Sequence, residues 1–149
     1  MKKLTVFILS LFMMLMVGSQ SVLANNRIDA SAAIMADAST GQIIYKQNVD
    51  KALPVASITK LLTILVIEDE IQQKQLSWDT QVKITPEIAA ISNDAAYSSI
   101  GLKSGQSYSV RTLINAALVK SADGATVALA TATGDGTDEF NLKMMQKAK

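Results

Sequence analysis

The sequence predicts an α/β (α+β) fold in which helices pack on an antiparallel sheet. Residues 33–45 have the pattern of a β-hairpin, and the chain after residue 56 has several segments with the apolar spacing of helices. No second hairpin is convincing. Because a lone hairpin is marginal without further strands or a packed helix, we expect the sheet of this chain to be incomplete.

Two short apolar segments form the expected hairpin. They are residues 33–36 (AIMA) and 42–45 (QIIY), and the turn cluster DASTG lies between them at 37–41. Gly41 in this cluster permits a positive φ, as tight turns often require. Pro54 follows a polar segment and stops any strand or helix before it.

A helix is predicted from Ser57 to about Gln75. Apolar residues recur at helical spacing along it: Ile58, Leu61, Leu62, Leu65 and Val66. Ile64 and Ile67 add apolar character on the other side. A helix that is apolar nearly all round is typically a central, buried one.

The middle of the chain predicts two further helices. A possible strand within 76–84 precedes a helix that begins near Thr85, and a loop covers 93–105. A second helix spans 110–120 and is expected to be capped by Ser109. Its predicted apolar face consists of Leu113, Ile114, Ala117 and Leu118.

The last part of the chain predicts two more helices. A polar break precedes an apolar helix over 125–133, which Gly134 closes as a C-terminal cap. Thr137 is expected to cap the final helix. Phe140 and Met144 lie on one face of that helix and are candidates for packing.

The N-terminus predicts a secretory signal peptide over residues 1–24. Lys2 and Lys3 precede an apolar run over 4–17, and Ala24 ends an approximate cleavage site. The run is shorter than the roughly 20 residues that cross a bilayer. We therefore expect export to the outer face of the cell membrane or the cell wall; the alternative is an uncleaved N-terminal anchor.

Composition excludes several classes of function. Removal of residues 1–24 leaves 125 residues, with 12 basic and 13 acidic side chains and a formal charge of −1. Such a chain has no basic stripe for a nucleic acid. It contains no cysteine and no histidine, which excludes disulfides, a thiol nucleophile, a Ser-His-Asp triad and histidine metal sites. We expect no metal and no cofactor.

The tetrad Ser57-Ile58-Thr59-Lys60 is the strongest candidate for chemistry. Residues three apart lie on one helix face, so the Lys60 amine can reach the Ser57 hydroxyl. A buried lysine favours its neutral form, which can accept the serine proton. The tetrad alone is common, and the alternative is a helix cap followed by an exposed lysine.

The order of several further motifs supports a chemical role for the tetrad. They are ADASTG at 36–41, PVASITKLLT at 54–63, LKSG at 102–105, VRTLI at 110–114 and SAD at 121–123. In this order the chain resembles the low-molecular-mass penicillin-binding proteins that are serine-type D-alanyl-D-alanine carboxypeptidases of the peptidase S11 family. The resemblance implies their β-lactamase/transpeptidase-like fold.

The resemblance also implies a mechanism and its partners. Ser57 is the acyl-ester nucleophile on a peptidoglycan stem peptide that ends in D-Ala-D-Ala, and Lys60 accepts its proton. Ser121 relays a proton to the departing D-alanine. β-Lactams are expected to acylate Ser57 because they resemble the D-Ala-D-Ala end.

Two departures from the family pattern qualify the expected activity. Asp123 occupies the substrate-binding asparagine position of the S-x-N motif, and an ionised carboxylate only accepts hydrogen bonds. No K-T-G follows Ser121. We therefore expect 25–149 to be the N-terminal part of a catalytic domain, without the K-T-G strand and C-terminal domain, and with little activity. Membrane association is expected only through the family's C-terminal anchor, which is also missing.

Other interpretations remain open. A β-lactamase or esterase on the same fold fits the tetrad equally well, and a non-catalytic peptidoglycan-binding protein fits Asp123 and the missing motif. Asp123 is as consistent with a cap for the following helix as with a role in the site. Trp78 is expected to pack rather than bind a ligand, and residues 97–99 lie in a loop near the predicted cleft.

Overall fold

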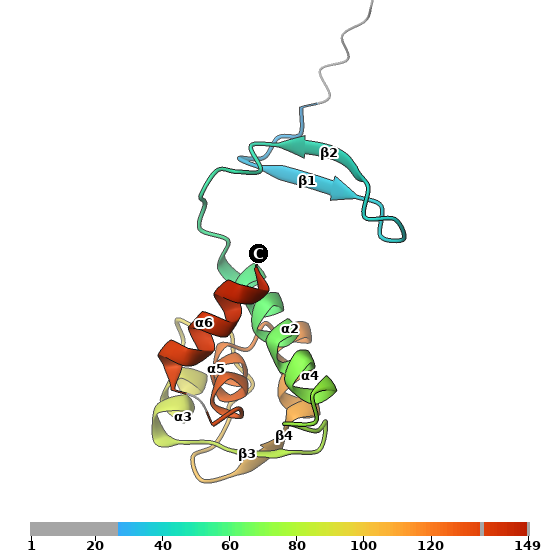
Figure 1. The fold of residues 1–149 in the computed structure, drawn as a ribbon. Helices are drawn as coiled ribbons and strands as arrows, with labels where there is room; N and C mark the ends of the chain where they lie inside the picture. The colour runs from blue at the N-terminus through green and yellow to red at the C-terminus, as the bar shows by residue number, and fades with distance from the viewer. Residues whose placement is uncertain (1–26, 135, 149) are drawn as a thin grey trace, which may run out of the picture. The chain divides into compact units, whose positions relative to one another are not determined.

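The computed structural model of the chain describes residues 27–134 and 136–148 (Figure 1). They belong to two compact units, one that ends at Ala52 and one that begins at Leu53. The predicted signal peptide lies outside the described residues. Among the described helices, none has the length and apolar character needed to span a bilayer.

The first unit is the predicted hairpin. Strand β1 (Ala33–Ala36) pairs with strand β2 (Ile43–Gln47) in antiparallel register, with Ala33 opposite Gln47. Both apolar segments are confirmed as strands, although β2 begins one residue later than predicted and extends to Gln47. Gly41 has φ +72° in the turn, the conformation that a glycine permits.

Asp37 organises the hairpin turn. Its Oδ1 accepts hydrogen bonds from the backbone N–H groups of Ser39 at 3.0 Å and Thr40 at 2.8 Å, and from both hydroxyl groups. The Ser39 hydroxyl makes the largest contribution, and together these donors lower the pKa of Asp37 from 3.8 to about 2. The ionised carboxylate is therefore part of the turn.

The turn should lose this organisation in acid. Because the folded pKa of Asp37 is depressed, its contribution to the turn is complete above pH 3.8 and is lost as the pH falls through about 2. The amide chemical shifts of Ser39 and Thr40 should titrate with a midpoint near 2. Asp37→Asn should abolish this titration; a midpoint near 3.8 in the parent would contradict the assignment.

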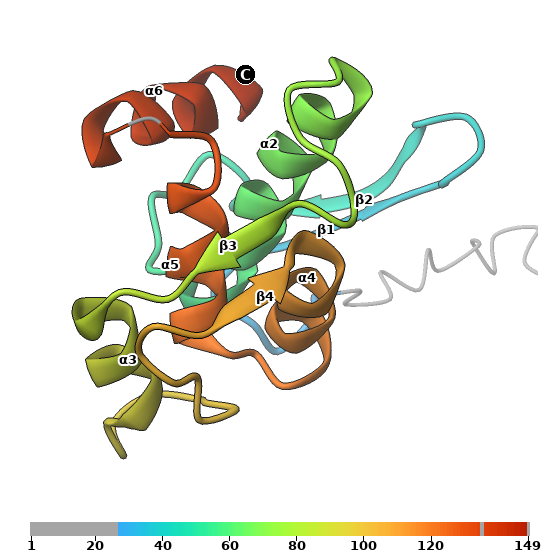
Figure 2. The same ribbon diagram turned by 90° about the horizontal axis from the view of Figure 1, so that it is seen from below.

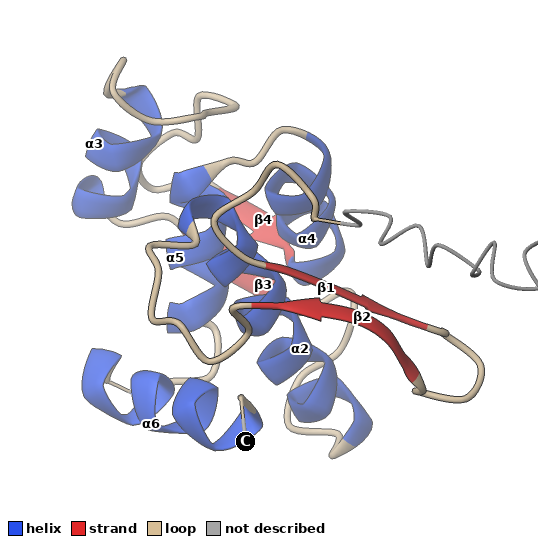
Figure 3. Cartoon of the chain, turned by 90° about the horizontal axis from the view of Figure 1, so that it is seen from above, coloured by secondary structure: helices blue, strands red, loops and turns tan. Residues whose placement is uncertain are grey.

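The second unit contains five helices among its described residues, a 3₁₀ turn and a two-stranded sheet. The elements follow in the order η1 (Ala56–Ile58), α2 (Thr59–Gln72), β3 (Gln81–Lys83), α3 (Pro86–Asn93), β4 (Ser107–Ser109), α4 (Val110–Val119), α5 (Asp123–Thr131) and α6 (Thr137–Lys147). Strands β3 and β4 are antiparallel, with Val82 opposite Tyr108. Figures 1 and 2 show α2, α4 and α5 on one side of this strand pair. Figure 3 shows the predominance of helix around it.

Local signals predicted the starts of α3 and α4. Thr85 accepts a hydrogen bond from the N–H of Ile88 at the start of α3, and Ser109 accepts one from the N–H of Thr112 at the start of α4. The strand within 76–84 is confirmed as β3. Strand β4 was not predicted, because its three residues contain two serines and pair only with a distant segment.

Two predicted helix starts are wrong. Helix α5 begins at Asp123, two residues before the predicted start, because Ala122 rather than a polar residue is its N-cap. Thr137 does not cap α6: Gly136 is the N-cap, and Thr137 is the first residue of the helix. Phe140 is buried and Met144 packs against the core, as predicted.

The buried face of α2 differs from the predicted one. Ile58, Leu61 and Leu65 are 64%, 51% and 44% exposed among the described residues. The buried residues of α2 are Lys60, Thr63, Ile64, Val66, Ile67 and Glu70. Val66 of the predicted face is among them, but so are Ile64 and Ile67 of the other side, because α4, α5 and α6 pack on a different part of the α2 surface from the one that apolar spacing indicated. Leu118 of α4 is likewise exposed rather than buried.

Candidate functional site

Ser57 lies in the 3₁₀ turn η1, directly before α2. The prediction placed it at the start of the helix, and the structure places it within the turn that leads into that helix. Ala56, which precedes it, has φ +45°, a conformation that is uncommon for a residue with a Cβ. Such backbone conformations concentrate at functional sites, where the surrounding structure maintains them.

The Lys60 side chain is nearly buried and is surrounded by oxygen atoms. Its Nζ lies 3.3 Å from Ser57 Oγ and 2.9 Å from Ser121 Oγ. It also donates to the backbone carbonyl of Ser121 and forms an ion pair with Asp123 Oδ1 at 3.0 Å. The side chain is 11% exposed. The alternative of an exposed lysine after a helix cap is therefore wrong.

Ser121 connects the lysine to the first serine. Its hydroxyl donates to Ser57 Oγ at 3.0 Å, across 64 residues of sequence. Ser121 has φ +51°, and in this conformation both its hydroxyl and its carbonyl contact Lys60. The three residues form a closed network of hydrogen bonds, in which a proton can pass between any two neighbours.

Asp123 joins this network from the first turn of α5. The N-cap of α5 is Ala122 and Asp123 is the first residue of the helix, so the interpretation of Asp123 as the cap is wrong. Instead Oδ1 pairs with Lys60, and Oδ2 accepts from the N–H of Ser98 at 3.1 Å. The Asp123 N–H in turn donates to the Ser98 carbonyl at 2.9 Å. We call Ser57, Lys60, Ser121 and Asp123 the Lys60 cluster.

A buried serine fixes the loop that supplies Ser98. Ser92 of α3 is 1% exposed, and its Oγ accepts from the N–H of Leu102 at 2.9 Å and lies 3.1 Å from Ser99 Oγ. Ser99 also donates to the Ser92 carbonyl. Asn93 donates to the Leu102 carbonyl at 3.1 Å. This network was not predicted, since a single serine at a helix end or in a polar loop gives no sequence signal of burial.

Gly124 brings α5 close to that buried serine. A Cβ built on Gly124 would lie 2.7 Å from Ser92 Cβ, which is closer than packed carbon atoms approach. Helices α3 and α5 therefore approach closely at the residue that follows Asp123. A glycine at this position permits the contact that places Asp123 beside Lys60.

Gly124→Ala should lower the free energy of unfolding by about 1–3 kcal/mol, because the new methyl group overpacks this contact. Chemical denaturation measures the loss. Ser92→Gly removes the carbon that the methyl group meets, so the cost of Gly124→Ala should be smaller in that background. An equal cost in both backgrounds would mean that steric overlap with Ser92 is not the cause.

A cavity of about 470 Å³ opens beside the Lys60 cluster. Ser57, Lys60 and Asp123 line one part of it, and Tyr97 and Val127 line another. Tyr97 is half exposed. Of the loop at 97–99, Tyr97 therefore lies in the wall of the cleft.

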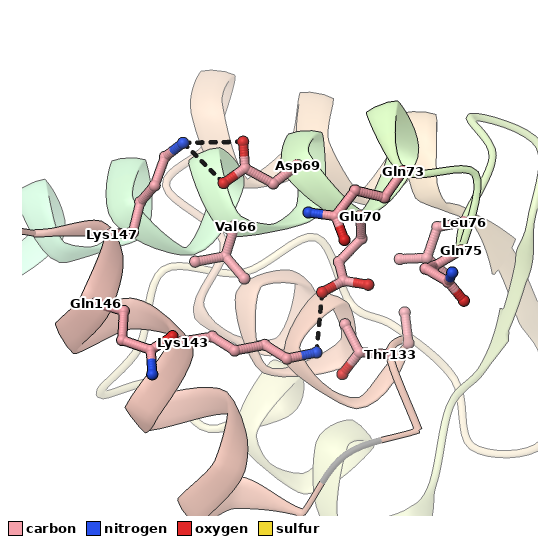
Figure 4. Close-up of a pocket in the computed structure, with 11 residues that line it drawn as sticks. Val66, Asp69, Glu70, Gln73, Gln75, Leu76, Thr133, Lys143, Gln146 and Lys147 are labelled. Carbon is pink, nitrogen blue, oxygen red and sulfur yellow. Dashed lines mark hydrogen bonds and ion pairs between the residues drawn. The ribbon is translucent and has the colours of Figure 1, made fainter.

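A larger cavity of about 630 Å³ lies away from the cluster, between α2 and α6 (Figure 4). Two ion pairs cross it: Lys143 to Glu70 at 2.9 Å and Lys147 to Asp69 at 2.7 Å. These charged groups already neutralise one another. The arrangement joins α6 to α2 and thereby supports the packing around the cluster.

Trp78 lies outside both cavities. The Arg111 guanidinium stacks 5.2 Å from the centre of its ring, and the Arg111 N–H donates to its carbonyl. Arg111 also approaches Asp79 at 3.9 Å. These contacts agree with the expected packing role of Trp78.

The chain matches a known protein family over most of its length. The model of the peptidase S11 family, described as D-alanyl-D-alanine carboxypeptidase, matches residues 19–149. D-alanyl-D-alanine carboxypeptidase DacF of Bacillus subtilis is 27% identical over 121 residues, which are 81% of this chain and 30% of that protein. The chain therefore spans about a third of this curated relative.

Solved structures of similar proteins have the same fold. The crystal structure of the D-alanyl-D-alanine carboxypeptidase DacD from Francisella tularensis matches with a TM-score of 0.74 and 35% identity, over 84% of this chain and 29% of that one. Penicillin-binding protein D2 from Listeria monocytogenes, in its cefotaxime-bound form, matches with a TM-score of 0.67 and 30% identity, over 83% of this chain and 48% of that one. The predicted fold class and family are confirmed.

Proposed function

We propose that Ser57 is a nucleophile for acyl transfer from peptidoglycan stem peptides that end in D-Ala-D-Ala. The chain belongs to the peptidase S11 family of D-alanyl-D-alanine carboxypeptidases. The members of this family are serine hydrolases. The observation that carries the proposal is the closed network between Ser57, Lys60 and Ser121, with the lysine amine nearly buried.

The proposed reaction begins with proton transfer. Neutral Lys60 accepts the hydroxyl proton of Ser57 while Ser57 Oγ bonds to the carbonyl carbon of the penultimate D-alanine. Ser121 passes a proton from Lys60 to the amide nitrogen as its bond to that carbon breaks, which releases D-alanine. Water then hydrolyses the acyl-serine ester and restores the serine hydroxyl.

Penicillin is the proposed inhibitor of the same serine. A β-lactam amide takes the place of the scissile amide, and its ring opening leaves an ester on Ser57. The similarity to the cefotaxime-bound Listeria protein supports this part of the proposal. Residues 1–24 are proposed to direct export, which would bring Ser57 to the compartment of the cell wall.

The test is covalent labelling with a fluorescent penicillin. The parent chain should be labelled with 1:1 stoichiometry, and Ser57→Ala should remove the label. Ser104→Ala is the matched control, because Ser104 is exposed in a turn away from the cluster and its loss should leave labelling unchanged. Labelling that persists in Ser57→Ala would show that another residue is the nucleophile.

A second function is favoured by Asp123. Its carboxylate forms an ion pair with Lys60 at 3.0 Å, and this pair occupies the amine that the proposed reaction uses as a base. A non-catalytic protein that binds peptidoglycan would tolerate this pair. Binding of muropeptides that Ser57→Ala leaves undiminished, together with no acylation by penicillin, would support this function over the first.

A further inference from the structure

A second cavity continues the cleft of the Lys60 cluster along α2 and α5. It has a volume of about 300 Å³ and lies next to the first, because the two share four lining residues: Thr59, Thr63, Thr126 and Val127. Two of these come from α2 and two from α5. The two cavities thus form one groove, which begins at Ser57 and Lys60 and ends at α6.

The far end of the groove has no charged side chain. Its lining residues there are Ala130, Thr131, Thr137, Phe140, Asn141 and Met144, and Phe140 is 2% exposed. None of the charged groups of the Lys60 cluster lines this part. The groove therefore changes along its length, from charged beside Ser57 to uncharged and largely apolar beside α6.

Three of the five threonines that line the second cavity use their hydroxyl donors within the chain. The Thr63 hydroxyl donates to the Met144 sulfur at 3.8 Å, and that of Thr126 donates to the Ala122 carbonyl at 3.0 Å. The Thr131 hydroxyl donates to the Ala128 carbonyl at 2.8 Å. Because these three donors are used within the chain and no charged residue lines the second cavity, it favours an apolar group over a charged one.

We propose that the second cavity is a subsite for an apolar side chain on the acyl group that is transferred to Ser57. The inference rests on the proposed function of Ser57. The second cavity has roughly twice the volume of a ~150 Å³ apolar cavity that accommodates benzene. A phenyl ring with a short linker to the reacting carbonyl therefore fits the space, and Met144 can adjust its flexible side chain to it.

Val127 is the residue that tests this subsite. It lines both cavities and is 38% exposed, so a larger side chain can fill their shared section without entering the core. Val119 is the matched control. It is a valine on α4 with 76% exposure and lines neither cavity.

The experiment compares two β-lactams that differ only in the acyl side chain. These are 6-aminopenicillanic acid, which has none, and phenoxymethylpenicillin. Intact-protein mass spectrometry gives the acylation rate constant of each. The parent should prefer phenoxymethylpenicillin, and Val127→Trp should reduce this preference roughly tenfold, since burial of the ring is lost. Val119→Trp should leave the preference unchanged. An unchanged preference in Val127→Trp would overturn the subsite.

A binding measurement keeps the subsite separate from the acylation chemistry. Phenoxyacetamide carries the apolar group without a β-lactam, and titration into the parent and into Ser57→Ala should shift the methyl NMR signals of Val127 and Met144. The signals of Val119 should not move. If neither β-lactam acylates the parent, the proposed function fails while this titration still decides the subsite. Absence of shifts at Val127 and Met144 would overturn it.

Discussion

Lys60→Arg should lower the rate at which penicillin acylates Ser57 by about 10²- to 10⁴-fold, the range by which a positioned general base accelerates a reaction. The guanidinium keeps the positive charge beside Asp123 and Ser121, but it does not lose its proton in proteins. The variant therefore removes proton acceptance while it leaves a cation in the cluster. Stopped-flow fluorescence with a labelled penicillin measures the rate constant.

Lys60→Ala provides the complementary test. It removes the amine and leaves space near Ser57 Oγ, from which Lys60 Nζ lies 3.3 Å away. Added methylamine should restore part of the acylation rate in Lys60→Ala and none in Lys60→Arg, because the arginine side chain still fills the site. Acylation by Lys60→Arg within a few-fold of the parent would show that the residue acts through its charge and not as a base.

Features set by neighbouring residues were predictable from the sequence. The hairpin follows from two apolar segments around a turn cluster. Asp37 forms that turn through hydrogen bonds from the N–H groups of Ser39 and Thr40. Thr85 and Ser109 cap their helices through bonds that span three residues. In each case the donor and acceptor lie within one turn of chain, so the sequence contains the whole interaction.

Features set by distant residues were predicted less well. Apolar spacing on α2 indicated the face with Leu61 and Leu65, both of which are exposed, because the spacing does not encode where α5 and α6 pack. The Ser57–Lys60 pair was predicted from its spacing. Its contacts with Ser121 and Asp123 span more than 60 residues, and only the order of family motifs indicated that these two residues lie at the site.

The anchoring of Asp123 illustrates the same limit. Its two hydrogen bonds to Ser98 depend on a loop whose position is set by the buried Ser92. Serines at these positions are indistinguishable in the sequence from exposed loop serines. Gly124 belonged to the polar break that was predicted before α5, and its close approach to Ser92 was not predicted.

Asp123→Asn should raise the acylation rate of Ser57 by about tenfold, which is roughly the effect of one hydrogen bond to a charged group. The aspartate carboxylate forms an ion pair with Lys60 Nζ at 3.0 Å, and the amine must leave this pair to accept the Ser57 proton. The asparagine amide has nearly the same shape and is neutral, so it holds the Lys60 amine less strongly. The rate constant for a labelled penicillin measures the gain.

The same substitution should lower the free energy of unfolding by about 1–3 kcal/mol, because it removes the counter-charge from a nearly buried lysine. Faster acylation and lower stability in one variant cannot both come from a disturbed fold, since disorder in the Lys60 cluster would slow acylation. Asp79→Asn is the matched control: Asp79 approaches Arg111 on the surface, with its side chain 87% exposed, and its loss should change neither quantity appreciably. An Asp123→Asn variant that acylates no faster than the parent would mean that the carboxylate does not limit Lys60 as a base, and would remove the main argument for a non-catalytic function.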